Sequence, residues 1–354
     1  PMPTFSAEDL RTLLGGAFEA VGYPAGEAAL IARLMVDANL AGHDSHGVRQ
    51  LGRYLGLVAK GHVVAGATIE VVRETPTTAV LEANRALGHV AAARAVEIGV
   101  AKARRMRISI VGVRNLDHVG RVGAYPELAA GQGMICLAFV CAQGRGRLVA
   151  PFHGIARRLG TNPISAAFPM ADGPPILLDF ATSTVAANKV RQAHDRGQQA
   201  GEGWLMDAEG NPTRDPRVFL DGGGVMFPLG GEQGYKGYAL AVLVDILAGV
   251  LTGAGSADVV REMTNNGTLL ITIDPEAFLP RADYERQLAG LAAYLRATAT
   301  RPGGPAVELP GDFEARHRAE REAAGIEIEE PVWQKIVAAV EPLGLAAIPA
   351  ALAG

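Results

Sequence analysis

The stretch TAVLEANRALGHVAAARAVEIGVAKARRMRISIVGVRN, residues 78–115, indicates the fold class of this chain. TAVLEAN at 78–84 is typical of a strand, the segment 88–106 is typical of an amphipathic helix, and ISIVGVRN at 108–115 is typical of a buried strand. A helix between two strands at this spacing is the pattern of an α/β unit. The sequence therefore predicts an α/β fold.

Helices precede this unit. Ser6 is a suitable N-cap for AEDLRTLLGGAFEAVG, which we expect to end at Gly22, and a second helix follows Pro24 with apolar residues at helical spacing. TIEVVRET at 68–75 predicts a further strand, joined to the next by a turn that contains proline. The first part of the chain is therefore expected to be helical.

Strands and irregular loops follow the unit. MICLAFV at 134–140 predicts a buried strand, and the chain between 142 and 228 is rich in Gly and Pro with only short strands. A loop and then a buried helix are expected at 228–251, followed by a strand from Thr268. From Asp312 onward the tail is charged and predicts a solvated helix.

Composition excludes several classes of function. With 354 residues and a net charge of −4, the chain is of ordinary globular composition and has no electrostatic reason to bind nucleic acid. Its most apolar run, 237–255, carries Asp245 in the middle, which indicates a buried helix and no membrane span. Cys136 and Cys141 should point to opposite faces of one strand, so no disulfide is expected, and a cytoplasmic location fits.

The stretch GHDSHGVRQLGRY, residues 42–54, concentrates polar side chains that could carry chemistry. His43 and His46 have a spacing that could share a metal ion, but no third ligand lies nearby, so no metal site is expected. Ser45 is adjacent to His46, and neighbouring side chains usually point apart, so an ordinary Ser–His nucleophile pair is not predicted.

Familiar nucleotide and hydrolase signatures are absent from the sequence. No strand runs into G-x-G-x-x-G with an acidic residue about twenty positions later, so a Rossmann site is not predicted. The phosphate loop G-x-x-x-x-G-K-[ST] and the elbow G-x-S-x-G are missing too. Four loops nevertheless have the composition of site loops: RLGTNP at 158–163, DFATS at 179–183, GYKG at 234–237 and LPGD at 309–312. Lys236 is expected at a helix N-terminus, which favours anions.

Together, these motifs resemble the malate/L-lactate dehydrogenase family that lacks a Rossmann fold. The matching pieces are AGHDSHGV, HVGRVGAY, APFHG…RRLGTNPISAAFP, LLDFATS, YKGYALA…DILAGVLTGA, ITIDPEAF and LPGD, in the family's order and over nearly the whole chain. ANLAGHDSHG and PFHG…GTNP are most similar to its bacterial hydroxycarboxylate dehydrogenase branch.

The resemblance implies hydride transfer between NAD, or alternatively NADP, and a small 2-hydroxy or 2-oxo carboxylate in a homodimer. It also implies a mixed α/β, non-Rossmann fold in three parts: a helical part from residues 1–60 and 300–354, an α/β nucleotide-binding part from 61–125 and 229–299, and a largely antiparallel β part at 126–228.

The resemblance also assigns roles to residues. His46 would be the acid/base, Ser45 its hydrogen-bonded relay partner, and His118 either a base or a wall of the site near the cofactor. The expected substrate contacts are Arg49, Thr161, Asn162, Ala187, Asn188 and Lys189. The expected cofactor contacts are His118, Val119, Gly120, Arg121, Cys141, Asp179, Phe180, Ala181, Thr182, Lys236, Gly237, Pro310, Gly311 and Asp312.

The chain departs from its relatives at two positions. Many relatives carry an arginine four residues after the histidine, where it can grip a carboxylate, but Gln50 stands there and Arg49 stands one place earlier. One residue turns a helix by about 100°, so Arg49 need not substitute. Some relatives have a relay aspartate where this chain has Lys189.

Two other functions remain open. One is reduction of a cyclic imine of the piperideine-2-carboxylate type, which Lys189 disfavours because it stands where the relay aspartate of such reductases is expected. The other is a nucleotide-binding protein that has lost catalysis, which the joint presence of Ser45, His46, His118 and Lys236 disfavours.

Overall fold

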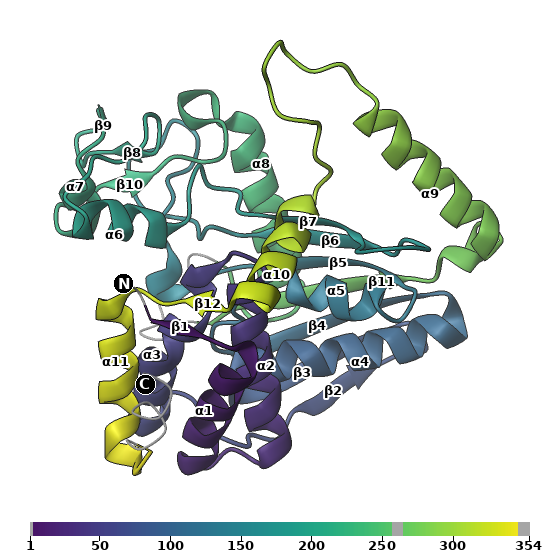
Figure 1. Cartoon of the computed structure of the whole chain (residues 1–354), viewed down its shortest axis with the longest axis horizontal. Coiled ribbons are helices and arrows are strands. Elements are labelled where there is room, and N and C mark those ends of the chain that lie inside the picture. The colour runs from purple at the N-terminus through teal and green to yellow at the C-terminus, as the bar shows by residue number, and fades with distance from the viewer. Residues whose placement is uncertain (1–2, 257–264, 346–354) are drawn as a thin grey trace.

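A mixed seven-stranded sheet forms the centre of the protein, in a computed structural model that describes residues 3–256 and 265–345 (Figure 1). The strands, in spatial order, are β2 (Glu70–Glu74), β3 (Thr78–Ala86), β4 (Ile108–Leu116), β11 (Thr268–Ile273), β5 (Ile135–Val140), β6 (Ile164–Phe168) and β7 (Ile176–Phe180). Only β3 and β4 run parallel; every other pairing in this sheet is antiparallel. The predicted α/β class is confirmed.

The helix α4 (Gly88–Met106) makes the crossover between the two parallel strands. Its buried side chains are mostly alanines, which let it lie close to the sheet. Gly99 marks the closest approach, since a Cβ there would stand 3.0 Å from Oγ1 of Thr272, and its carbonyl accepts the Ser109 hydroxyl at 2.7 Å. The α/β unit predicted at 78–115 is therefore confirmed.

Successive side chains of a strand point to opposite faces of the sheet, and helices cover both faces. On one face, Cys136, Ala138 and Leu270 pack with α4 and α5 (Ala124–Ala130). On the other face, residues such as Phe139 and Leu269 pack with α8 (Tyr235–Val244) and the π-helical turn η5 (Asp245–Val250) that continues it. Cys136 thus faces α4 while Cys141 lies in the second cluster, and both are free thiols, as predicted.

A helical layer packs beside the sheet and joins the two ends of the described chain. It contains α1 (Ala7–Ala20), α2 (Ala25–Leu40), α3 (Leu51–Ala59) and α11 (Glu330–Val340). The short strands β1 (Thr4–Phe5) and β12 (Ile326–Glu327) pair with each other. Ser6 caps α1 by accepting the Asp9 N–H at 3.1 Å, and Gly22 follows the helix with a φ of 98°, as the sequence predicts.

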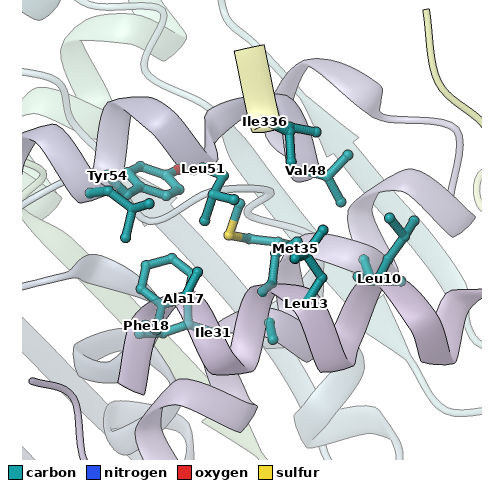
Figure 2. Packing of buried hydrophobic residues seen from close by; sticks show 14 of the residues in the cluster. Leu10, Leu13, Ala17, Phe18, Ile31, Met35, Val48, Leu51, Tyr54 and Ile336 are labelled. Carbon is teal, nitrogen blue, oxygen red and sulfur yellow. The ribbon is translucent and has the colours of Figure 1, made fainter. Parts of the chain in front are cut away.

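Fully buried side chains hold these helices together (Figure 2). Leu10, Leu13 and Phe18 of α1 pack against Ile31 and Met35 of α2 in one cluster with residues of α3 and α11. The same cluster includes Tyr54 of α3, whose ring is fully buried. The helical core therefore fixes the position of α3, which follows the polar stretch 42–50.

A third group of elements surrounds a small sheet of strands in the order β10-β8-β9. The elements are α6 (Ala187–Asp195), β8 (Leu205–Met206), β9 (Pro212–Thr213), α7 (Pro216–Leu220) and β10 (Val225–Met226). They share a hydrophobic cluster with α8. The division of the chain into three parts, at the boundaries given in the sequence analysis, stays a prediction. Residues 257–264 and 346–354 of these predicted parts lie outside the described residues.

Two further helices precede the C-terminal helix α11. The charged helix expected from Asp312 is α10 (Asp312–Ala324). No helix is predicted above at 281–296, where the structure has α9 (Arg281–Arg296), although Tyr284, Leu288, Leu291 and Leu295 recur there at helical spacing. The helix stands apart from the sheet in Figure 1 and buries only Ala292. In the described part of the chain, no helix combines the length and the apolar character needed to cross a bilayer.

Candidate active site

The first part of the polar stretch 42–54 forms two short 3-10 turns between α2 and α3, η1 (Asp44–His46) and η2 (Val48–Gln50). Its last four residues begin α3. Asn39 at the end of α2 clamps both turns: its Oδ1 accepts the Val48 N–H at 2.8 Å, and its Nδ2 donates to Asp44 at 2.6 Å. Gly47 lies directly against this amide, since a Cβ there would stand 1.9 Å from Oδ1 of Asn39. The glycine is therefore required by space and fixes the turn that carries His46.

The helix α10 braces the same turns from the other side. Arg321 donates to both carboxylate oxygens of Asp44, at 2.7 and 3.1 Å, and also to the carbonyl of Asn39. Glu314 accepts a hydrogen bond from, or forms an ion pair with, Nε2 of His43 at 2.9 Å. His43 is therefore held from α10, whereas His46 is hydrogen-bonded within its own turn.

The side chain of Ser45 is hydrogen-bonded to its neighbour, with Oγ 2.9 Å from Nδ1 of His46. The carbonyl of Ser45 accepts two amide hydrogen bonds, from Gln50 at 2.7 Å and from Asn188 of α6 at 3.3 Å. Adjacent side chains usually diverge, but the tight 3-10 turn brings this pair together. Engagement of Nδ1 by Ser45 leaves Nε2 as the ring nitrogen available to a ligand.

A second histidine lies parallel to the first. The rings of His46 and His118 are stacked, with centroids 5.6 Å apart and planes 10° from parallel. Nδ1 of His118 lies 2.7 Å from the Tyr54 hydroxyl and accepts the Gly120 N–H at 3.3 Å. Because a backbone N–H can only donate, Nδ1 is an acceptor, and the ring proton of neutral His118 is on Nε2.

Burial keeps these imidazoles uncharged. Desolvation, followed by the positive charges of His43 and Arg121, lowers the pKa of His46 to about 4. Desolvation and then the charge of Arg53 lower the pKa of His118 well below its usual value. Both rings are therefore neutral near pH 7, so each can accept a proton or present one tautomeric N–H without charge.

Two cavities meet at the stacked histidines. Cavity A has a volume of about 690 Å³, and cavity B has a volume of about 410 Å³. Their linings share six residues: His46, His118, Ala142, Thr161, Ala186 and Asn266. His46 and His118 therefore lie on a wall common to the two cavities.

Many residues predicted for the site line these cavities. Cavity B is lined by these predicted residues: Ser45, His46, His118, Val119, Gly120, Arg121, Thr161, Asp179, Phe180, Ala181 and Lys189. Cavity A has a smaller set: His46, His118, Thr161, Ala187 and Asn188. Segments far apart in the sequence thus converge on one place.

A buried charge network forms one wall of cavity B. Asp179 accepts the Gly123 N–H at 2.9 Å and lies 3.9 Å from Nε of Arg121. Arg121, almost fully buried, also donates to Glu127 at 2.9 Å. Burial raises the pKa of Asp179 despite the opposing charge of Arg121. The network holds the loop 119–123 against the end of β7.

Other predicted site residues lie outside the linings of the two cavities: Arg49, Cys141, Asn162, Thr182, Lys236, Gly237, Pro310, Gly311 and Asp312. Asn162 and Thr182 are fully buried and brace the loops beside cavity B, where Thr182 donates to the carbonyls of Thr161 and Asn162 at 3.1 and 3.0 Å. Asn162 in turn donates to the carbonyl of Ala241 in α8 at 2.9 Å.

The loop LPGD is bound to the edge of the sheet. The carbonyl of Pro310 accepts the Leu177 N–H of β7 at 2.9 Å, and Asp312 forms an ion pair with Arg296 at 2.7 Å. Lys236 occupies the first turn of α8, as predicted, with its ammonium 5.7 Å from the ring of Tyr235. The cofactor roles of these residues stay predictions.

The structure adds residues that sequence reasoning did not single out. Tyr54 holds His118, Arg53 lines cavity A, and residues 184–186, which follow the DFATS motif, line cavity B. Arg53 follows Gln50 by one helical turn, a spacing that could have drawn attention to it. Arg49 instead lines a separate cavity of about 200 Å³ with Asp44 and Glu329.

No group of three or more His, Cys, Asp or Glu side chains suited to a metal ion occurs within residues 3–256 and 265–345. His43 and His46 direct their bonded ring nitrogens to different partners, Glu314 and Ser45. The two histidines of GHDSH therefore do not form a shared pair of ligands.

A family model and the sequence of a known protein both match nearly the whole chain. The family model described as malate/L-lactate dehydrogenase matches residues 5–337. Hydroxycarboxylate dehydrogenase B of Escherichia coli strain K12 is 35% identical over 349 residues, which cover 96% of this chain and 94% of that protein.

Solved structures are similar over almost the full length. A putative malate/lactate dehydrogenase from E. coli superposes with a TM-score of 0.93 at 34% identity and covers 99% of both chains. The delta1-piperideine-2-carboxylate reductase of Pseudomonas syringae pvar. tomato superposes with a TM-score of 0.82 at 29% identity, over 94% of this chain and 98% of the other.

Proposed function

The chain belongs to the malate/L-lactate dehydrogenase family, and from this premise we propose that it interconverts a 2-hydroxy acid and the corresponding 2-oxo acid with a nicotinamide dinucleotide, using His46 as the acid/base. The observation that carries the proposal is the position of His46 on the wall shared by cavities A and B. There, one ring nitrogen is held by Ser45 and the other remains for a ligand.

Cavity B has the chemistry expected of a nicotinamide site. Valines 119, 122, 140 and 185 offer apolar surface for a flat ring, and the buried Arg121 offers a fixed positive charge. When bound, a nicotinamide supplies the hydride acceptor for oxidation and the hydride donor for reduction. We propose NAD, with NADP as the alternative; the acidic-residue rule that separates the two belongs to the Rossmann fold and does not apply to this site.

His46 handles the proton at the reacting oxygen. In oxidation, its neutral ring accepts the hydroxyl proton at Nε2 while the C–O bond becomes a carbonyl. A pKa of about 4 keeps this base form filled at neutral pH. In reduction the protonated ring returns the proton to the same oxygen, and the negative charge of a bound 2-oxo acid favours that protonated state.

Two neighbours prepare His46 for this role. Ser45, at 2.9 Å from Nδ1, stabilises whichever protonation state the ring adopts, because a hydroxyl can donate or accept. His118 presents a neutral face parallel to His46 and, by its Nε2–H, a donor toward the shared wall. Thr161 and Asn188 lie at cavity A as substrate contacts, and Lys189 lies at cavity B.

A cyclic-imine reductase is the second candidate, because the reductase from P. syringae is similar over nearly the whole chain. Protonation at an imine nitrogen would use the same histidine. Lys189 stands where a relay aspartate is expected in such enzymes, and it lines cavity B. We therefore rank the oxo-acid reaction first and treat assembly as a homodimer as a prediction, to be measured by sedimentation.

The decisive experiment is a turnover panel with a matched variant. Pyruvate, oxaloacetate, 2-oxoglutarate, phenylpyruvate and piperideine-2-carboxylate are each offered with NADH and with NADPH. We expect turnover of an oxo acid, and a loss of at least about 100-fold in kcat in His46→Ala with NADH binding retained. Turnover of the imine alone would favour the second candidate. Cofactor binding without any turnover would favour a non-catalytic protein, and wild-type turnover in His46→Ala would refute the role of His46.

A further inference from the structure

Cavity A carries more positive charge than the one carboxylate of a simple hydroxy acid would require. Among the described residues, its lining holds three cationic side chains, Arg53, Lys60 and Arg191, together with His62, and one carboxylate, that of Asp117. Arg53 and Lys60 come from α3 and its end, and Arg191 comes from α6, so positive charge reaches the cavity from two elements. Such a chamber attracts anions.

The guanidinium of Arg53 is available to a ligand. Its side chain is 40% exposed, and within residues 3–256 and 265–345 it forms an ion pair only with Asp117, whose oxygen is 3.6 Å away, beyond hydrogen-bond distance. Asp117 is itself buried and accepts the His118 N–H at 2.6 Å, so it stays in place while Arg53 can turn toward the cavity. A planar guanidinium in this state suits a carboxylate, which it can bind through two parallel hydrogen bonds.

Two neighbouring polar groups of cavity A, Gln50 and Arg191, already have partners. The Gln50 amide donates to the Ser45 carbonyl at 2.7 Å, and Arg191 donates to Asn188 at 2.9 Å. Arg49 lines the separate cavity with Asp44 and does not line cavity A. Arg53 therefore stands on the face of α3 that continues from Gln50 toward cavity A, one turn farther from His46.

We propose that Arg53 is a specificity-determining residue that binds a second anionic group of the substrate, distant from the hydroxyl, so that this protein prefers 2-hydroxy acids with an acidic group at the far end of the chain. This inference rests on the proposed function. The volume of cavity A, about 690 Å³, leaves room beside His46 for such a tail.

The test compares diacids with monoacids of equal chain length. Malate, 2-hydroxyglutarate and 2-hydroxyadipate are paired with 2-hydroxybutyrate, 2-hydroxyvalerate and 2-hydroxyhexanoate, and kcat/KM is measured with the better cofactor. We expect at least one diacid to exceed its monoacid by about 10- to 100-fold, the range that a charge-assisted hydrogen bond provides. Arg53→Met should abolish this preference by raising KM for the diacid much more than KM for the monoacid.

Two further variants make the result specific. Arg53→Lys keeps a cation near Asp117 but loses the paired donors, so it should retain part of the preference and guards against a folding defect in Arg53→Met. Arg94→Met is the matched control, because it removes an exposed arginine of α4 that pairs with Glu97. It should leave both series unchanged.

Distinct results overturn the two proposals. Turnover of both series without any preference for a diacid overturns the role of Arg53 and leaves the proposed function standing. An equal loss for diacid and monoacid in Arg53→Met, or loss of the preference in Arg49→Met instead, also overturns it. If no hydroxy acid is turned over with either cofactor, both proposals fall.

Discussion

The hydroxyl of Tyr54 lies 2.7 Å from Nδ1 of His118, and this contact joins the helical core to the candidate active site. The ring of Tyr54 is fully buried in the cluster shown in Figure 2, so its hydroxyl has a fixed position. His118 in turn stacks on His46. Packing between helices thus helps to fix the orientation of a histidine at the wall between the two cavities, while the Gly120 N–H sets its tautomer.

The first prediction follows from this contact. Tyr54→Phe keeps the packed ring but removes the hydroxyl, so His118 loses one of the two groups that hold its Nδ1. Such a hydrogen bond contributes about 0.5–1.5 kcal/mol to stability, so the free energy of unfolding should fall by about that amount. We expect kcat to fall by about 2- to 10-fold, because His118 is held less firmly. Steady-state kinetics and circular dichroism measure the two quantities.

Tyr23→Phe provides the control from the same hydrophobic cluster. The hydroxyl of Tyr23 is buried without a hydrogen-bond partner among the described residues, so its removal should leave kcat unchanged and should not lower stability. A decrease in kcat of equal size in both variants would mean that Tyr54 acts only through general packing.

The pH dependence of the reaction supplies the second prediction. Burial lowers the pKa of His46 to about 4, and oxidation needs the neutral ring. The value of kcat/KM for a 2-hydroxy acid should therefore be constant from about pH 6 to 8 and fall about tenfold per unit below about pH 4. For the 2-oxo acid the sign is opposite, because the protonated ring is needed, so kcat/KM should decrease as pH rises above about 4.

Acid should also lower the stability of the fold, because burial keeps His46, His89 and His118 neutral. Their lowered pKa values contribute stability that is present above the ordinary value of 6.5 and is lost as pH falls toward about 4. Circular dichroism at each pH separates unfolding from titration of His46. An inflection in kcat/KM near 6.5, in protein that remains folded, would contradict a desolvated His46.

The fold could be predicted where local pattern and packing agree. The crossover unit at 78–115 has a helical period between two strand segments, and all three elements are present. The helix α9 could have been predicted in the same way, because Tyr284, Leu288, Leu291 and Leu295 recur at helical spacing, although the helix buries only Ala292. The position of β11 between β4 and β5 joins segments remote in sequence, and no local pattern encodes such pairing.

The candidate site could be predicted in part. The resemblance selected His46, Ser45 and His118, and the structure brings them to one place. It could not show that Arg49 and Arg53 line different cavities, because that depends on the 3-10 turns that rotate the chain between α2 and α3. Nor could it show that Thr182 and Asn162 direct their side chains to backbone groups.

The third prediction concerns the turn that carries His46. Gly47→Ala would place a methyl group 1.9 Å from Oδ1 of Asn39, the atom that accepts the Val48 N–H. Either the clamp on both 3-10 turns breaks or His46 moves, so we expect a loss of about 1–3 kcal/mol in the free energy of unfolding and a fall in kcat of at least about tenfold. Urea unfolding and steady-state kinetics measure these losses.

Gly15→Ala is the matched control, since a Cβ at this position in α1 meets nothing within 4 Å. In the interior of a helix, alanine should raise stability by about 0.5–1 kcal/mol and leave kcat unchanged. Asn39→Ala combined with Gly47→Ala relieves the collision but not the loss of the clamp, so stability should partly recover while kcat stays low. If Gly47→Ala alone retained both stability and kcat, the turn would not depend on this contact, and the positioning of His46 would have to come from Ser45 and Asn188 instead.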